Sequence, residues 1–124
     1  MNAASSIQAV MHNLFEFQKS GYLCDTVIIA DDGQLKAHSS VLAAASPVFK
    51  SALKCDGVVK EHTLVLPGVK LYVAKAIIQI IYTGKATLQC SEYESVDTIL
   101  RMYEELCISQ VLDQSHRYWK FFFL

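Results

Sequence analysis

Apolar residues near the N-terminus recur at helical spacing. Ser5 and Gln8 have the S-x-x-Q spacing of a capping box, and Gly21 is a suitable stop, so the pattern predicts a helix between them. The residues on its main face are Ile7, Val10, Met11, Leu14 and Gln18. Phe15 and Phe17 project about 80° to either side of that face. The apolar stripe on this helix is wider than one contact with the core needs. It therefore predicts a second surface that could contact a partner.

A β-hairpin is predicted next. Residues 23–30 (LCDTVIIA) form a short run of apolar and β-branched residues, and Asp31, Asp32 and Gly33 close it with turn chemistry. Residues 34–37 return as the second strand.

Two short helices are predicted over residues 38–53. The first covers 38–45, and the second begins with Ser46 as its N-cap and Pro47 at its first position. A brief strand at 63–66 and a Pro67-Gly68 turn lead into a long apolar helix at 69–82, which Gly84 ends. The residues that line its predicted buried side are Leu71, Ala74, Ile77, Ile78 and Ile81.

The C-terminal third is predicted to be mainly helical. Residues 85–88 can add a short strand, and Ser91 and Glu94 form a capping box before a helix. Its apolar residues recur at i, i+3, i+4 and i+7: Val96, Ile99, Leu100, Tyr103, Leu106 and Cys107. A last helix is expected over 109–120. The order of elements predicts an α+β fold with more helix than sheet, in a single domain over residues 1–120 with a hydrophobic tail at 121–124.

Composition narrows the classes of function. The chain of 124 residues is 52% hydrophobic and 19% charged, which is typical of a folded domain. Its net charge of −1 provides no basic field for a phosphate backbone, so direct binding of nucleic acid is not expected. No apolar stretch is long enough to cross a bilayer, and no membrane association is expected.

The cysteines and histidines do not form a recognisable catalytic or metal-binding pattern. The four cysteines lack a C-x-x-C pair, and the four histidines show no i, i+3 or i, i+4 pairing. Asp25 and His38 could exchange a proton, but no nucleophile motif accompanies them. The sequence therefore predicts reduced cysteines, no metal, no cofactor and no enzymatic activity.

Four motifs, in order, resemble the BTB/POZ domain over about residues 10–120. They are Cys24-Asp25 with V-I-I, the run AHSSVLAAASPVF from Ala37, Leu66-Pro67-Gly68, and Ile81-Tyr82-Thr83-Gly84. The resemblance implies a helical cluster flanked by a small mixed sheet, with an N-terminal dimerisation helix. It also implies a protein-interaction module that homodimerises and has no catalytic activity.

The resemblance suggests which residues mediate binding. We expect a homodimer interface at Ile7, Val10, Met11, Leu14, Phe15, Val41 and Ala44. No strand is expected before the first helix, so the dimer should rest mainly on helix packing. The family pocket would contain Asp25, His38 and Ser39, and Ser39 stands where corepressor-binding members carry a basic residue. With this departure, the resemblance does not imply a charged pocket here.

Two main readings of the biological role remain open, beside a third in which an isolated BTB protein caps the dimer surfaces of its partners. The first is the N-terminal domain of a nuclear, zinc-finger type transcription regulator that recruits corepressors or other partners. The alternative is a cytoplasmic substrate adaptor of a cullin ubiquitin ligase, because Val59-Lys60-Glu61 matches the hydrophobic-x-Glu triplet of adaptor members. In that case Val59 and Glu61 would contact the cullin.

Overall fold

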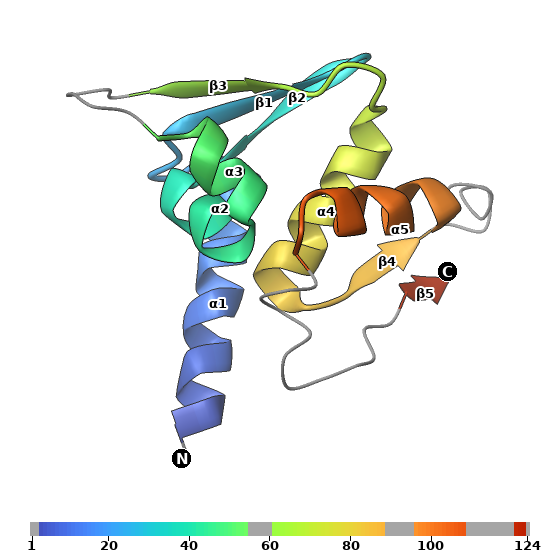
Figure 1. Ribbon diagram of the computed structural model, residues 1–124. Helices are drawn as coiled ribbons and strands as arrows, with labels where there is room; N and C mark the ends of the chain where they lie inside the picture. The colour runs from blue at the N-terminus through green and yellow to red at the C-terminus, as the bar shows by residue number, and fades with distance from the viewer. Residues whose placement is uncertain (1–2, 55–60, 89–95, 109–120, 124) are drawn as a thin grey trace.

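The computed structural model describes residues 3–54, 61–88, 96–108 and 121–123 (Figure 1). The chain starts with an 18-residue helix, α1 (Ala3–Ser20), which leads into a three-stranded sheet and a cluster of helices. The α+β prediction is confirmed. Helix α1 starts before the predicted capping box, because Ala3 and Ala4 are strong helix formers that extend it past Ser5.

Helix α1 ends where the sequence indicates, and the following connection is tightly turned. Gly21 has φ of 83°, the left-handed conformation that terminates a helix, and Leu23 also has a positive φ of 59°. The first strand therefore begins only at Thr26, and the prediction that it starts at residue 23 was wrong. A left-handed residue cannot continue a β-strand, so Leu23, Cys24 and Asp25 lie in the connection.

The sheet is mixed and has the order β2-β1-β3. Strands β1 (Thr26–Ala30) and β2 (Gly33–Ala37) form the predicted hairpin, with Ala30 opposite Gly33. Strand β3 (His62–Val65) pairs parallel with β1 on its other side, one residue earlier than predicted. Ile28 and Leu64 of the paired strands are buried on the side that faces the helices.

Helices α2 (Ser39–Ala45) and α3 (Pro47–Ala52) follow the hairpin and pack against each other. The predicted cap between them is confirmed, since the Ser46 Oγ accepts a hydrogen bond from the Phe49 N–H at 3.1 Å. The same hydroxyl donates to the Leu106 carbonyl at 2.5 Å. Ser46 thus ties the α2–α3 junction to the C-terminal helical segment.

Helix α4 (Leu71–Thr83) runs through the middle of the molecule, with α1 and α2 on one side and α5 (Val96–Glu105) on the other (Figure 1). It buries more than the single face that the sequence predicts, because elements pack around it on several sides. Its buried residues are Val73, Ala74, Ala76, Ile77, Ile78, Ile80, Ile81 and Tyr82. Helix α4 is therefore the centre of the hydrophobic core.

The C-terminal part contributes a second, two-stranded sheet. Strand β4 (Ala86–Leu88) pairs parallel with β5 (Phe121–Phe123), which covers most of the predicted tail. Helix α5 ends at Glu105, so Cys107 is not on its face as predicted but in a left-handed turn with φ of 57°. The predicted helix at 109–120 and the capping box at 91–94 lie outside the described residues.

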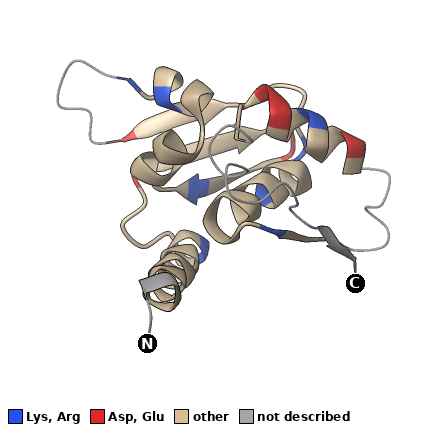
Figure 2. Cartoon of the chain, turned by 60° about the horizontal axis from the view of Figure 1, so that its bottom comes forward, with Lys and Arg blue, Asp and Glu red and all other residues tan. Residues whose placement is uncertain are grey.

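Charged side chains are scattered over the molecule, and α1 is uncharged along most of its visible length (Figure 2). None of the helices in the described ranges is long and apolar enough to cross a membrane. Within the same ranges, no three His, Cys, Asp or Glu side chains come together as a group that could hold a metal ion.

Candidate functional site

The N-terminal half of α1 presents apolar side chains to solvent. Ile7 is 63% exposed and Val10 is 58% exposed, and Figure 1 shows this end of the helix projecting away from the sheet. The helix carries no Lys, Arg, Asp or Glu before Glu16. A contiguous apolar surface without charge is a common mark of an interaction site.

A groove continues this surface onto α2. It has a volume of about 240 Å³ and is lined mainly by apolar groups of α1, α2 and α4: Met11, Ser40, Val41, Ala44, Ala45 and Ile81. The structure thus brings three of the predicted interface residues, Met11, Val41 and Ala44, into one groove. We call this groove and the exposed face of α1 the helix-one surface.

The other predicted interface residues on α1 lie closer to the chain's own core. Leu14 and Phe15 are partly buried and pack against the core cluster. The Phe15 ring centroid is 6.0 Å from that of Tyr82, and the Phe15 side chain borders a different cleft from the one that Met11 lines. The broad stripe of α1 is therefore divided between the core and the exposed surface.

Asp25 and Ser39, two of the three residues predicted for the pocket, meet at the start of α2. The Ser39 N–H donates to Asp25 Oδ1 at 2.7 Å, and the Ser39 Oγ donates to Oδ2 at 2.5 Å. Thr26 adds a weaker hydrogen bond at 3.3 Å. A neutral hydroxyl therefore lies beside the Asp25 carboxylate, and these two residues form no ion pair.

The hydrogen bonds tune the acidity of this carboxyl group. Partial burial works to raise the pKa of Asp25, but the donors from Ser39 and Thr26 stabilise the charged form and hold the pKa below its ordinary value. A carboxyl with a lowered pKa stabilises the fold above its ordinary pKa. That contribution is lost as the pH falls through the lowered value.

We expect Ser39→Ala to raise the pKa of Asp25 toward its ordinary value. Loss of a hydrogen bond to a partly exposed carboxylate should reduce the free energy of unfolding by about 1 kcal/mol at neutral pH. NMR titration of the Asp25 carboxyl carbon and urea unfolding measure the two effects. Ser51→Ala, at an exposed position on α3, is the control and should change neither. An unchanged Asp25 pKa in Ser39→Ala would contradict the assignment.

His38 lies beside this pair but is buried in a hydrogen-bond cluster of its own. Its Nε2 is 3.0 Å from the Tyr22 carbonyl, which can only accept, so Nε2 is the donor of this hydrogen bond. The Nδ1 is hydrogen-bonded to the Tyr82 hydroxyl at 2.6 Å. The hydroxyl oxygen in turn accepts from the His38 backbone N–H at 3.0 Å. Every polar group of this cluster is satisfied, which is typical of a structural role.

Tyr82 is the residue of this cluster that the sequence did not single out as a partner of His38. It is 44 positions away on α4, and only its place in the Ile-Tyr-Thr-Gly motif marked it. The cluster thus joins the start of α2 to the end of α4. A separation of that size leaves no periodic signal in a single sequence.

Cys24 also lies beside His38, but its thiol is not activated as a nucleophile. Its Sγ is 3.7 Å from His38 Nε2. Burial, and to a lesser degree the charge of Asp25, raises the pKa of the Cys24 thiol. A thiol with a raised pKa is a weak nucleophile at neutral pH.

The proposed cullin contact cannot be assembled from the described residues. Val59 lies outside them, and Glu61 is exposed just before β3. Contact of Val59 and Glu61 with a cullin therefore stays a prediction.

Comparison with solved structures identifies the architecture. The fold matches the BTB domain of zebrafish PATZ1 with a TM-score of 0.73, covering 91% of this chain and 90% of that chain at 23% sequence identity. The arrangement of α1, the mixed sheet and the helical cluster is therefore the BTB fold.

Sequence comparison agrees and extends this assignment. The family model of the BTB/POZ domain matches residues 14–121, so the chain belongs to the BTB/POZ family. Rat zinc finger and BTB domain-containing protein 38 is 35% identical over 109 residues, which cover 87% of this chain. Human transcription regulator protein BACH1 is 32% identical over 118 residues, which cover 93% of this chain. The matched segment is 9% of the first relative's length and 15% of the second's.

Proposed function

We propose that the chain is a homodimerising protein-interaction module of a nuclear transcription regulator. The observation that carries the proposal is the helix-one surface, an exposed and uncharged apolar helix face beside an apolar groove. The relatives named as a zinc finger protein and a transcription regulator support the regulatory role. Corepressors or other regulatory proteins are the further partners that this role implies.

A second copy of the chain fits the helix-one surface by symmetry. In a twofold interface each copy presents the same patch, so Met11 of one copy meets the groove of the other and the reverse. Burying an aliphatic side chain contributes about 1.5–3 kcal/mol to the free energy of association. In a twofold dimer, Ile7, Val10 and Met11 are each buried in both copies, so their contribution is doubled. Dimerisation removes these side chains from water without burying a charged group.

Sedimentation equilibrium tests the proposal. The chain at micromolar concentration should have twice the 13.9 kDa mass of a single copy. Met11→Asp should weaken the dimer by about 100-fold or more, because it places an unpaired carboxylate in an apolar contact. If this variant proves insoluble, Ile7→Asp makes the same test at a position further from the core.

Ala9→Asp is the matched control. It adds the same charge to the same helix, on an exposed residue about 160° around the helix from Met11. We expect it to remain dimeric. A monomeric parent chain, or equal dissociation of the Ala9 and Met11 variants, would contradict dimerisation through the helix-one surface.

A further inference from the structure

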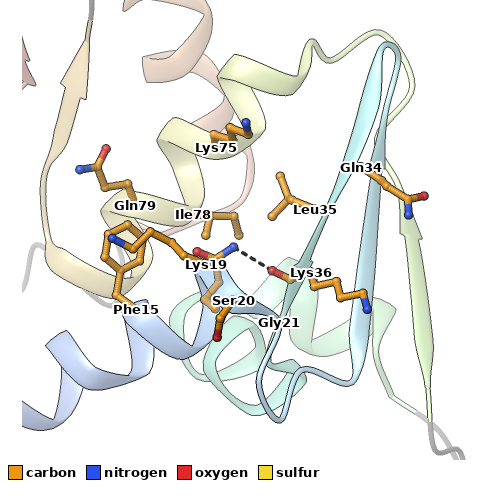
Figure 3. A pocket seen from close by; sticks show the side chains of 11 residues that line it. Phe15, Lys19, Ser20, Gly21, Gln34, Leu35, Lys36, Lys75, Ile78 and Gln79 are labelled. Carbon is orange, nitrogen blue, oxygen red and sulfur yellow. Dashed lines mark hydrogen bonds between the residues drawn. The ribbon is translucent and has the colours of Figure 1, made fainter.

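A second cleft lies between the C-terminal end of α1, strand β2 and helix α4 (Figure 3). Its volume is about 720 Å³, and it shares no lining residue with the groove of the helix-one surface. Phe15, Leu35 and Ile78 contribute its apolar lining. We call it the lysine cleft.

The lysine cleft concentrates positive charge on a chain whose net charge is −1. Lys19, Lys36 and Lys75 come from three different elements, and none of the eleven lining residues is acidic. The neutral polar groups among them are mainly side-chain amides, those of Gln18, Gln34 and Gln79. The cleft therefore offers positive charge and amide groups around an apolar lining.

Two of these lysines are available to an incoming anion. Lys19 is already held locally, with its Nζ 2.9 Å from Glu16 and 4.8 Å from the Phe15 ring centroid. Lys36 and Lys75 are exposed and form no salt bridge to any acidic residue that the structure describes. Because Lys19 is paired locally, Lys36 and Lys75 are the groups that would bind the negative charges of a ligand.

The cleft also runs beside the free edge of β2. This strand is the first in the order β2-β1-β3, so no strand in the described part of the chain pairs with its other side. The Gln18 Nε2 donates to the Lys36 carbonyl at 2.8 Å, which shows that this carbonyl points away from β1 (Figure 3). Backbone groups two residues apart point the same way in an antiparallel strand. Gln34 therefore directs its N–H and carbonyl to the same free edge.

We propose that the lysine cleft binds an acidic peptide segment in an extended conformation. The segment would pair with the free edge of β2 at Gln34, a recognised mode of peptide binding. Its acidic side chains would lie toward Lys36 and Lys75, and an apolar side chain would rest near Leu35 and Ile78. This combination of strand edge and apolar lining favours a peptide over a bare anion or a nucleic acid backbone.

The lysine cleft lies outside the helix-one surface, so peptide binding and dimerisation are separate properties. Failure of one test leaves the other unaffected. If a variant with weakened peptide binding still sediments as the parent chain does, the two surfaces act independently.

Fluorescence anisotropy with a labelled peptide of alternating glutamate and leucine tests this proposal on the complete 124-residue chain. Lys36→Glu with Lys75→Glu should weaken binding about tenfold or more, because two attractive contacts become repulsive. Lys50→Glu with Lys54→Glu, on exposed positions at α3, is the charge-matched control and should stay within about twofold of the parent. Lys36→Gln with Lys75→Gln repeats the test without repulsion if the first variant does not fold.

Two further peptides separate the components of recognition. A peptide of alternating glutamine and leucine should bind more weakly than the glutamate peptide, and N-methylation of alternate backbone amides should reduce the affinity of the glutamate peptide. The proposal would be overturned if the Lys50 and Lys54 variant weakened binding as much as the Lys36 and Lys75 variant. It would also be overturned if the glutamine peptide bound as tightly as the glutamate peptide. Tighter binding of a short DNA duplex that depends on Lys36 and Lys75 would also overturn it.

Discussion

Ile77→Ala should lower the free energy of unfolding by about 2–5 kcal/mol, through lost burial and the cavity left behind. Ile77 is 1% exposed on α4, which lies at the centre of the hydrophobic core. The loss is a large share of the 5–15 kcal/mol that is typical of a whole domain. We expect a fall in melting temperature of about 10 °C, measured by circular dichroism at one fixed protein concentration.

Val65→Ala is the matched control for this prediction. Val65 is a β-branched residue on β3, but it is 61% exposed. Its truncation should cost less than about 1 kcal/mol. A melting temperature for Ile77→Ala within about 2 °C of the parent's would contradict the central place of α4 in the core.

Tyr82→Phe should destabilise the fold by about 2–4 kcal/mol, although it removes only one oxygen atom. The Tyr82 hydroxyl is the partner of both the His38 N–H and His38 Nδ1, and both residues are buried. Without the hydroxyl, two polar groups of His38 remain buried and unsatisfied. Urea unfolding near neutral pH measures the loss.

The same hydroxyl predicts a loss of stability in alkali. Burial raises the pKa of Tyr82 to about 12, above its ordinary value of 10.0. A group with a raised pKa stabilises the fold fully below its ordinary pKa, and that contribution is lost as the pH rises toward the raised value. The parent chain should therefore lose stability between about pH 10 and 12 more steeply than Tyr82→Phe does.

Tyr22→Phe is the control for both measurements. Tyr22 is 56% exposed and contributes only its backbone carbonyl to the His38 cluster. Loss of its hydroxyl should change stability by less than about 0.5 kcal/mol. If Tyr82→Phe were as stable as Tyr22→Phe, the Tyr82 hydroxyl would not be the required partner of His38.

Much of the local structure could be predicted from the sequence, because its determinants lie within a few residues of one another. Gly21 ends α1 through its own left-handed conformation, and the Ser46 cap binds an N–H only three residues away. The Asp31-Asp32-Gly33 turn sets the hairpin register in the same way. Predictions were wrong where a neighbouring residue overrode the pattern, as Leu23 did by delaying the start of β1.

The candidate site could be predicted only in part. The spacing of Ile7, Val10 and Met11 indicated the apolar face of α1 before the structure placed Met11 in a groove. The spacing could not show which apolar residues of α1 face the core and which face the groove. Phe15 faces the core and the lysine cleft rather than that groove. Which side chains a helix buries depends on what packs against it.

The sequence alone determined the helical periodicity, the caps, the hairpin and the absence of a basic field, because each follows from composition or from contacts between near neighbours. The tertiary structure decided the parallel pairing of β1 with β3, the His38–Tyr82 cluster and the placement of Lys36 and Lys75 around one cleft. These groups are far apart along the chain, and no local rule relates them. Their contacts arise only when the core around α4 closes and brings the sheet and helices together.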